Sequence, residues 1–407
     1  MTKKKYQQLC RNIPEYNSIN KYETTAANKV MKSGLLSGFL AMPNKDSFFG
    51  GPEVLNLEKK WKKRFESDFA ISVNSASSGL VAALLAMNVK PGDEVIVPPY
   101  TMSATAMAPI SIGAVPIFVD IEDRRFGLDP SLVKKFITPK TKAIIVVNLF
   151  GNAAYLKELR KIADKNNIYL IEDNAQSILA TYNNKLCGKY GHVGIFSLNR
   201  HKHIHCGEGG ICITDNEEIG KNILLIRNHG ENASSIFGEK DNRICVGYNF
   251  RMTEISAAIA SVQLDKLDNL VERTEKIGLS LNEYCEDFEY LDMPLIEKNC
   301  RHVFFMWAPK LQQKKLGVPR DVIYKDLVKE RVPISQGYVK PLYHLPIFDN
   351  SPACKKIKKR ELCNITEGLY NDELLTIQIP GLDIRHKDIK SIYMSFKKTF
   401  SKYKKFI

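Results

Sequence analysis

Apolar and polar positions change their period several times between residues 69 and 215. Residues 69–75, FAISVNS, form a short run typical of a strand, and the ASSGLVAALLAMNV segment after it has its apolar residues at helical spacing. The same order of strand and then helix recurs, and further strands are predicted at VIVPP, VPIFVDIE, AIIVVNLFG and IYLIEDNA. Strands rich in Val and Ile that alternate with helices predict an α/β fold with a mostly parallel sheet covered on both faces.

The segments on either side of this core have a different pattern. Residues 1–50 predict helices and loops, and residues 252–277 predict one long helix with an apolar side. No low-complexity linker follows this helix, so we expect the parts of the chain to pack together. The sequence therefore predicts an N-terminal segment at 1–50, a large α/β domain at 51–275 and a small C-terminal α+β domain at 276–407.

The charge balance favours anionic partners. Lys and Arg number 59 against 45 Asp and Glu, which gives a net charge of +14. Nucleic acid, a membrane surface or small phosphorylated ligands would all suit this charge. No nucleic-acid motif with interleaved aromatic residues is present, so nucleic-acid binding is not expected. Lysine-rich stretches at 354–363 and 397–406 are interpreted as solvated helix faces, with a membrane-surface role as the alternative.

Cysteine usage and hydropathy bear on the location of the protein. Nine scattered cysteines, an odd number without a CxxC pair, indicate a reducing compartment, and the expected location is the cytoplasm. The apolar runs are far shorter than the ~20 residues of a membrane-spanning helix. The basic start MTKKKYQQLC has no apolar stretch behind it, so a signal peptide is not expected.

Two polar segments fall at the carboxyl ends of predicted strands, where ligands bind in such sheets. In SASSGL (75–80), backbone amides at a helix N-terminus would bind an anion; the alternative is an ordinary helix cap. In LIEDNAQ (170–176), Asp173 directly follows a buried strand. A buried carboxylate needs a partner, which could be a metal, a histidine or a protonated ring nitrogen; the alternative is again a cap. Strand alternation turns Glu172 to the opposite face.

A single lysine, Lys202, stands among three histidines in NRHKHIHCGEGG. A lysine amine is a nucleophile once its pKa is lowered, and pyridoxal phosphate is the usual aldehyde that captures it. The phosphate, ring nitrogen and aldehyde of this cofactor would be matched by SASSG, Asp173 and Lys202. The alternatives are a surface cation at Lys202, or zinc binding by His201, His203 and His205. No nearby Cys or carboxylate completes a zinc set, so no metal is expected.

Several segments resemble, in order and spacing, the DegT/StrS-type sugar aminotransferases, which are pyridoxal phosphate enzymes of fold-type I. The resemblance covers about residues 25–350 and is carried by VIVPPYTMSATA, VPIFVDIE, IEDNAQ, FSLNRHKHIHCGEGG and GYNFRMTEISAAIASVQL. It implies a central sheet with a smaller C-terminal domain, and it implies pyridoxal 5′-phosphate as the cofactor.

The resemblance also implies a role for each matching residue. Lys202 matches the lysine that binds the cofactor and moves protons, and Asp173 matches the partner of the pyridine nitrogen. Asn249 matches an asparagine that reaches the phosphate from the neighbouring subunit, which implies a homodimer with shared active sites. The remaining cofactor contacts fall on Ala76, Ser77, Gln176 and Ser197.

Three positions depart from the family pattern. Met102 stands where an aromatic residue often stacks on the cofactor ring, although a thioether can also pack on an aromatic face. His205 and Cys206 replace small hydroxyl residues. A subset of the family has a histidine in place of the lysine and dehydrates its sugar. Because this chain keeps Lys202, transamination is favoured.

The resemblance implies transfer of an amino group, with glutamate expected as the donor, to a nucleotide-linked 3- or 4-keto-6-deoxyhexose for amino-sugar or surface-polysaccharide biosynthesis. A free keto sugar or a cyclitol is an alternative acceptor, and a non-catalytic regulator that retains the fold is an alternative function. The candidates for substrate contact are Arg251, Tyr338, Tyr343 and His344, with Arg227 and Lys340 as further options.

Overall fold

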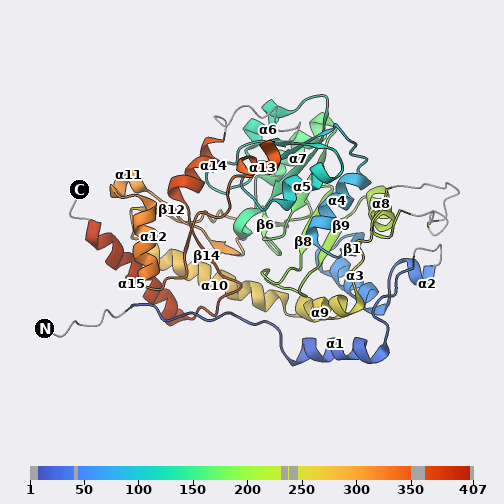
Figure 1. The fold of residues 1–407 in the computed structure, drawn as a ribbon, viewed down its shortest axis with the longest axis horizontal. Helices are drawn as coiled ribbons and strands as arrows, with labels where there is room; N and C mark the ends of the chain where they lie inside the picture. The colour runs from blue at the N-terminus through green and yellow to red at the C-terminus, as the bar shows by residue number, and fades with distance from the viewer. Residues whose placement is uncertain (1–7, 41–44, 231–236, 238–245, 350–362, 404–407) are drawn as a thin grey trace.

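A seven-stranded sheet forms the centre of the molecule (Figure 1). The computed structural model describes residues 8–40, 45–230, 237, 246–349 and 363–403. The strand order is β1-β9-β8-β5-β4-β2-β3, and β9 runs antiparallel to both of its neighbours. The predicted mostly parallel sheet is confirmed. Its strands are β1 (Phe69–Val73), β2 (Glu94–Val97), β3 (Val115–Phe118), β4 (Thr141–Val147), β5 (Tyr169–Asp173), β8 (Val193–Ser197) and β9 (Gly210–Thr214).

Alternate residues of these strands enter two different cores, one on each face of the sheet. In β4, Ile144 and Val146 pack with the helices on one face, whereas Ile145 packs with those on the other. The first face is covered by α3 (Pro52–Phe65), α6 (Pro130–Phe136), α7 (Leu156–Asn166) and α9 (Glu254–Asp265). The second is covered by α4 (Ala76–Ala86), α5 (Ala104–Ser111) and α8 (Glu217–Arg227).

The long helix predicted at 252–277 is instead two helices. The first, α9, ends at Asp265, and α10 (Leu267–Cys285) begins after a break at Lys266. The amide of Lys266 bonds to the carbonyls of Gln263 and Leu264, which tightens the last turn of α9. The apolar period continues across this break, so the sequence pattern did not reveal it.

A separate apolar core holds the C-terminal part of the chain together. Trp307 and Phe396 lie at its centre, fully buried. Its helices are α10, α11 (Gln313–Leu316), α12 (Arg320–Lys329) and α15 (His386–Tyr403). Its strands form two small sheets, one of β11 (Met306–Trp307), β14 (Leu375–Gln378) and β13 (Ser335–Gln336), the other of β10 (Leu291–Asp292) and β12 (Lys310–Leu311).

The N-terminal segment runs along one side of the molecule, from the C-terminal core to α1 (Lys21–Ser33), which packs on α9 (Figure 1). Cys10 lies in the C-terminal core. The remaining elements are α2 (Lys45–Phe48), η1 (Leu149–Gly151), β6 (Thr181–Tyr182), β7 (Lys185–Leu186), η3 (Leu342–His344), α13 (Pro346–Asp349), α14 (Asn364–Gly368) and the π-helical turn η6 (Leu369–Glu373).

Three predictions concern the surface and the ends of the chain. Within the described residues, no helix is long and apolar enough to cross a bilayer. Helix α15 buries one side and exposes Lys397 and Lys402 on the other, as a solvated face requires. The basic start at 1–7 and the lysine-rich residues 354–362 and 404–406 lie outside the described residues.

Candidate active site

A cavity of about 400 Å³ lies at the carboxyl ends of the parallel strands. Its walls come from the N-terminus of α4, the ends of β5 and β8, and the segments that lead into β11 and follow β13. Of the eight residues predicted to hold the cofactor, all but Asn249 line this cavity, and so does Tyr338. The seven are Ala76, Ser77, Met102, Asp173, Gln176, Ser197 and Lys202.

Lys202 lies in the loop between β8 and β9 and turns its amine into the cavity. The Nζ atom lies 4.7 Å from the centroid of the Phe305 ring, and it forms no ion pair with any residue that the structure describes. Burial lowers the pKa of Lys202 to about 8, while the nearby charge of Asp173 opposes this shift. About a tenth of the amine is therefore neutral at pH 7, far more than for an ordinary lysine.

Asp173 is the last residue of β5 and is almost fully buried. One carboxylate oxygen accepts the Ala175 amide hydrogen at 3.1 Å, and the other accepts the Thr105 hydroxyl hydrogen at 3.2 Å. Burial raises the pKa of Asp173, although the Ala175 amide and the charge of Lys202 oppose the rise. A cationic partner inside the cavity would stabilise the charged form of a carboxylate in this environment.

Glu172, as predicted, faces away from Asp173. It is fully buried on the other face of β5, where it accepts hydrogen bonds from the amides of Gly188, Tyr190 and Gly191 at 2.6–2.7 Å. These bonds fold the 188–191 turn against the strand, so Glu172 has a structural role and Asp173 alone of the two lines the cavity.

The N-terminus of α4 lies at one end of the cavity. Ser75 is its N-cap and accepts the Ser78 amide hydrogen at 3.1 Å, which leaves Ala76 and Ser77 at the cavity wall. Gly210 lies against this turn, since a Cβ atom there would come within 2.6 Å of the Ala76 nitrogen. Ser197, at the end of β8, lines the same region. Free amides and the helix dipole suit a phosphate at this place.

Gln176 connects the segment after β4 with the segment after β13 at the cavity wall. Its side-chain oxygen accepts the Phe150 amide hydrogen at 2.8 Å, and its side-chain nitrogen donates to the Tyr338 hydroxyl at 2.8 Å. The backbone amide of Tyr338 in turn donates to the hydroxyl of Tyr100 at 2.9 Å. Burial raises the pKa of Tyr338 to about 12, so its hydroxyl stays protonated at the cavity wall.

Met102 is 57% exposed and lies at the mouth of the cavity. Tyr100, the aromatic residue two positions earlier, is fully buried in the core and does not line the cavity. Of the two, Met102 is therefore the one placed to pack on a ring bound here.

Asn249 and Arg251 do not line the cavity of their own chain. The Asn249 side chain is exposed and accepts a hydrogen bond from Arg251 Nε at 2.9 Å, while Arg251 also donates to Asn228 at 3.3 Å. Both residues follow an exposed apolar pair, Val246 and Tyr248.

The other predicted substrate residues also lie outside the cavity. The Tyr343 hydroxyl and the His344 Nε2 atom both contact one carboxylate oxygen of Glu367 at 2.7 Å, so these side chains hold α14 in place. Lys340 is exposed. Arg227 is fully buried and forms an ion pair with Glu58 at 2.5 Å, which gives it a structural role in the core.

The three histidines around Lys202 point to different partners. His201 is exposed at the cavity mouth. His203 is buried and bonds through Nε2 to the Val303 carbonyl at 3.0 Å; burial lowers its pKa to about 4. His205 contacts Ser18 instead. Among the described residues, no group of three histidine, cysteine or acidic side chains is placed to hold a metal ion.

Several residues in the cavity or in contact with its lining were not identified from the sequence. Thr105 on α5 reaches Asp173, and Phe305 lies beneath the Lys202 amine. Gln378, at the end of β14, lines the mouth and donates to the His201 carbonyl at 3.4 Å. Phe305 and Gln378 are brought in by packing between distant segments and belong to no quoted motif, whereas Thr105 lies in VIVPPYTMSATA but was given no role.

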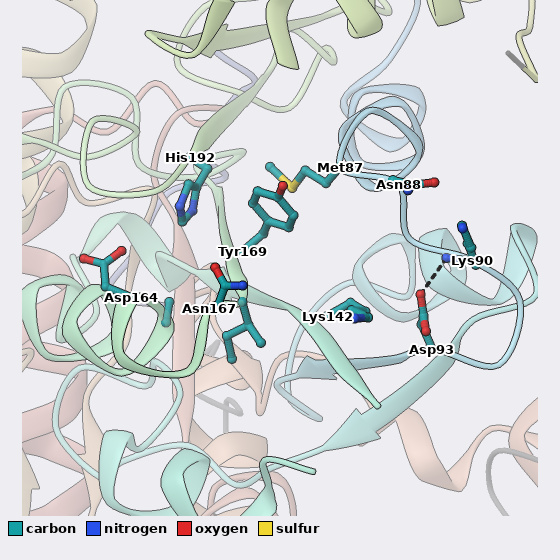
Figure 2. Close-up of a pocket in the computed structure, with 11 residues that line it drawn as sticks. Met87, Asn88, Lys90, Asp93, Lys142, Asp164, Asn167, Tyr169 and His192 are labelled. Atoms are coloured by element: carbon teal, nitrogen blue, oxygen red, sulfur yellow. Dashed lines mark hydrogen bonds between the residues drawn. The ribbon is translucent and has the colours of Figure 1, made fainter. Parts of the chain in front are cut away.

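A second cavity, of about 480 Å³, lies at the opposite ends of the strands (Figure 2). It is lined by residues at the starts of β4 and β5, such as Lys142 and Tyr169, and by His192 just before β8. None of the predicted site residues lies there, so the first cavity remains the candidate active site.

The residues of the first cavity fit pyridoxal phosphate. They offer a partly neutral amine without an ion-pair partner, a buried carboxylate suited to a protonated ring nitrogen, and an accessible helix N-terminus for the phosphate. In a mostly parallel sheet with a smaller C-terminal core, this set defines a pyridoxal phosphate enzyme of the fold-type I class.

Comparison with known proteins gives the family. A sequence model of the DegT/DnrJ/EryC1/StrS aminotransferase family matches residues 34–387, and the chain belongs to this family. The chain is 32% identical over 320 residues to the GDP-perosamine synthase of Caulobacter vibrioides, covering 78% of this chain and 84% of that one. The protein is therefore a pyridoxal phosphate-dependent sugar aminotransferase, as the motifs predicted.

Solved structures agree with this assignment. The aminotransferase from Psychrobacter cryohalolentis superposes with a TM-score of 0.86 at 25% identity, over 96% of this chain and 99% of that one. The E. coli GDP-4-keto-6-deoxy-D-mannose-3-dehydratase with bound hydrated pyridoxal phosphate superposes with a TM-score of 0.78 at 26% identity. The match covers 95% of this chain and 99% of that one.

Proposed function

We propose that this chain transfers an amino group from glutamate to a nucleotide-linked 3- or 4-keto-6-deoxyhexose, with Lys202 and Asp173 as its catalytic residues. The observation that carries the proposal is the placement of both groups in one cavity, where each alters the pKa of the other. Trapping the cofactor on Lys202 by reduction, followed by a panel of nucleotide-linked keto sugars, tests the two parts of the proposal.

The bound cofactor supplies an aldehyde for a lysine amine and a ring that accepts electrons from the carbon being deprotonated. Among the described residues that line the cavity, Lys202 is the one amine. Lys202 would hold the cofactor, and its free amine would act as the base that removes the proton from the donor α-carbon. It returns a proton to the sugar carbon in the second half of the reaction.

The other residues of the cavity orient and stabilise. Asp173 keeps the ring nitrogen protonated, and Thr105 and the Ala175 amide hold its carboxylate in place. The amides at Ala76 and Ser77, with the Ser197 hydroxyl, bind the phosphate. Gln176 and Tyr338 form one hydrogen-bonded wall, and we assign the Gln176 amide to the ring hydroxyl and Tyr338 to the sugar side of the site.

The acceptor is proposed from the relatives and from the charge of the chain. Two of the three proteins named above, the GDP-perosamine synthase and the GDP-4-keto-6-deoxy-D-mannose-3-dehydratase, have a GDP-linked sugar in their names. A net charge of +14 also suits a diphosphate ligand. Because Lys202 stands where dehydrating members of the family have a histidine, we propose amino transfer and not loss of water. Product analysis separates the two, since amino transfer leaves an amino group on the sugar, whereas loss of water leaves a deoxy sugar without it.

We further propose a homodimer in which each chain contributes to both active sites. In the single chain, Asn249 is exposed and Arg251 is half-buried next to Val246 and Tyr248, of which Val246 is 66% exposed. Large apolar side chains are also exposed on α1 and in the segment after it, at Met31, Leu35, Leu36 and Leu40. A second copy would cover these residues and would bring its Asn249 to the phosphate end of the cavity.

A further inference from the structure

The loop that carries Lys202 is anchored by the residues that follow the lysine. Its two ends are joined by the Leu198 amide, which donates to Gly209, and by the Cys206 amide, which donates to Leu198. On one side of the loop, His203 bonds to the Val303 carbonyl at 3.0 Å. On the side of the N-terminal segment, the loop is held by His205 and by an exposed ion pair between Arg200 and Glu15 at 3.6 Å.

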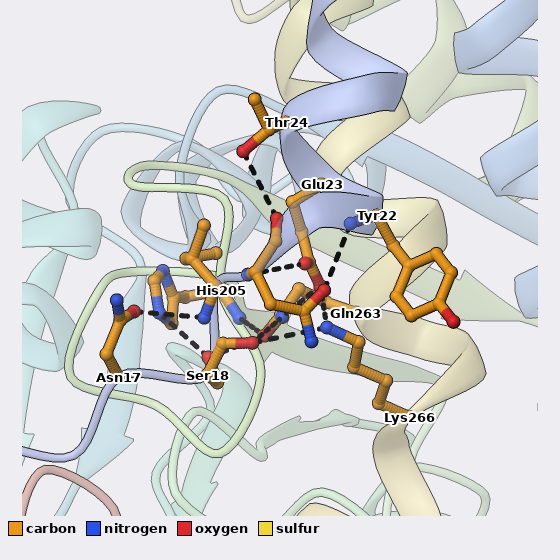
Figure 3. Close-up of polar contacts among 10 residues, drawn as sticks. Asn17, Ser18, Tyr22, Glu23, Thr24, His205, Gln263 and Lys266 are labelled. Atoms are coloured by element: carbon orange, nitrogen blue, oxygen red, sulfur yellow. Dashed lines mark hydrogen bonds and ion pairs between the residues drawn. The ribbon is translucent and has the colours of Figure 1, made fainter.

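His205 meets the N-terminal segment of the chain (Figure 3). Its Nε2 atom lies 3.2 Å from the Ser18 hydroxyl, and its backbone amide donates to the side-chain oxygen of Gln263 at 3.3 Å. The Ser18 hydroxyl donates to the same Gln263 oxygen at 3.1 Å. Because a hydroxyl has one proton to give, the His205 Nε2 atom must be the donor to Ser18, which fixes the tautomer of the imidazole.

A buried charge pair fixes Gln263 in this orientation. The Gln263 side-chain nitrogen donates to Glu23 at 2.7 Å, and Lys266 forms an ion pair with the same carboxylate. Glu23 is 1% exposed. If the Gln263 side-chain amide rotated by half a turn, its oxygen would face the Glu23 carboxylate, and two acceptors would oppose each other. The Gln263 oxygen therefore stays where it accepts from Ser18 and His205.

The N-terminal segment is itself fastened to the C-terminal core. Arg11 forms an ion pair with Asp388 at 2.8 Å, and the Pro14 carbonyl accepts the Asp383 amide hydrogen at 2.9 Å. The Tyr16 amide donates to Gly381 at 3.0 Å. Residues 8–20, which we call the N-terminal strap, therefore join the C-terminal core to the Lys202 loop and then continue into α1.

We propose that the N-terminal strap positions Lys202, and that Ser18 and His205 are the positioning residues that connect the two. The inference rests on the proposed role of Lys202 as the cofactor-binding lysine. His205 does not line the cavity, so it acts through the two residues that separate it from Lys202. Loss of the Ser18–His205 bond would let the loop move and would place the amine less often where it can react.

The test is the rate at which full-length apoprotein captures pyridoxal phosphate, followed by the absorbance of the lysine-bound cofactor. Ser18→Ala and His205→Phe each remove the bond, and we expect capture to slow by about three- to tenfold, the effect of one lost hydrogen bond. The double variant should be no slower than either single variant, because both changes remove the same bond. His205→Gln keeps an N–H donor at a similar reach and should restore the rate.

Thr24→Ala is the matched control. It removes an exposed hydroxyl that donates to Asn20 on α1, away from the loop (Figure 3), and should leave capture unchanged. Equal rates for wild type, Ser18→Ala and His205→Phe would overturn the inference, as would multiplied effects in the double variant. If the wild type itself gains no adduct at Lys202, the proposed function fails instead. If His205→Phe does not fold, the test is amide hydrogen exchange of residues 198–209 in Ser18→Ala, compared with the wild type. Faster exchange in the variant supports the inference, and unchanged exchange contradicts it.

Discussion

Lys202 and Asp173 are 29 positions apart (202 minus 173) and line the same cavity, where the charge of each opposes the effect of burial on the other. The sheet brings them together, because Asp173 ends β5 and pairs with Ile195 of the neighbouring strand β8, which leads into the Lys202 loop. An amine and a carboxylate held in this way can serve the two ends of one cofactor ring.

Asp173→Asn should lower kcat by a factor on the order of 10² or more, because a neutral amide does not keep a pyridine nitrogen protonated. Steady-state kinetics with saturating cofactor measure this loss, and the protein should still unfold at the wild-type temperature within a few degrees. A variant with full kcat would remove Asp173 from the mechanism.

Glu172→Gln is the matched change on the opposite face of β5. It replaces one of the acceptors for the Gly188, Tyr190 and Gly191 amides with an N–H group, so we expect a loss of about 1–3 kcal/mol in the free energy of unfolding. Denaturant unfolding measures the loss, and the folded fraction should keep its kcat. The reverse pattern, normal stability with a low kcat, would show that the roles of the two carboxylates are exchanged.

The rate of cofactor capture should rise with pH and level off above about pH 8. The neutral amine is the nucleophile, and burial lowers the pKa of Lys202 to about 8, so protonation inhibits capture below that value. In Asp173→Asn the charge that opposes this shift is gone, and the midpoint should move to lower pH. Stopped-flow mixing of apoprotein with pyridoxal phosphate across a pH series gives both midpoints. A wild-type midpoint near the ordinary lysine value of ~10.4 would contradict the burial of the amine.

Met102→Phe should tighten cofactor binding by about 0.5–1.5 kcal/mol, because an aromatic ring at the cavity mouth can stack on the pyridine ring. Equilibrium dialysis of the cofactor measures the change. Met394→Phe, an exposed position on α15, is the control and should bind the cofactor as the wild type does. Unchanged binding in Met102→Phe would mean that the side chain at position 102 does not lie over the ring.

Mixing two inactive variants tests the shared active site. In a heterodimer of Lys202→Ala with Asn249→Ala, one site combines the intact Lys202 of one chain with the intact Asn249 of the other, and the second site has lost both. A randomly reassociated equal mixture should therefore recover roughly a quarter of wild-type activity, since half of the dimers are mixed and each has one intact site. Activity no higher than the mean of the two separate variants would show that Asn249 serves its own chain or no site.

The sequence predicted the parts of this protein that depend on local pattern. Strand and helix alternation identified the sheet. Lys202 and Asp173 were identifiable because the cofactor needs their chemistry at strand ends.

Contacts between distant segments could not be predicted in this way. Phe305 and Gln378 reach the site through domain packing that no local pattern encodes. Tyr343 and His344 have plausible side chains for substrate contact, but Glu367 of α14 binds both of them. The break at Lys266 was hidden because the apolar period continues across it.

The most direct test of the central claim is borohydride reduction of the cofactor-loaded protein, followed by peptide mass mapping. We predict one pyridoxyl group per chain, located on Lys202, and none in Lys202→Ala, which should also lose activity by a factor on the order of 10³ or more. An adduct on any other lysine, or an unmodified Lys202 in an active preparation, would contradict the account.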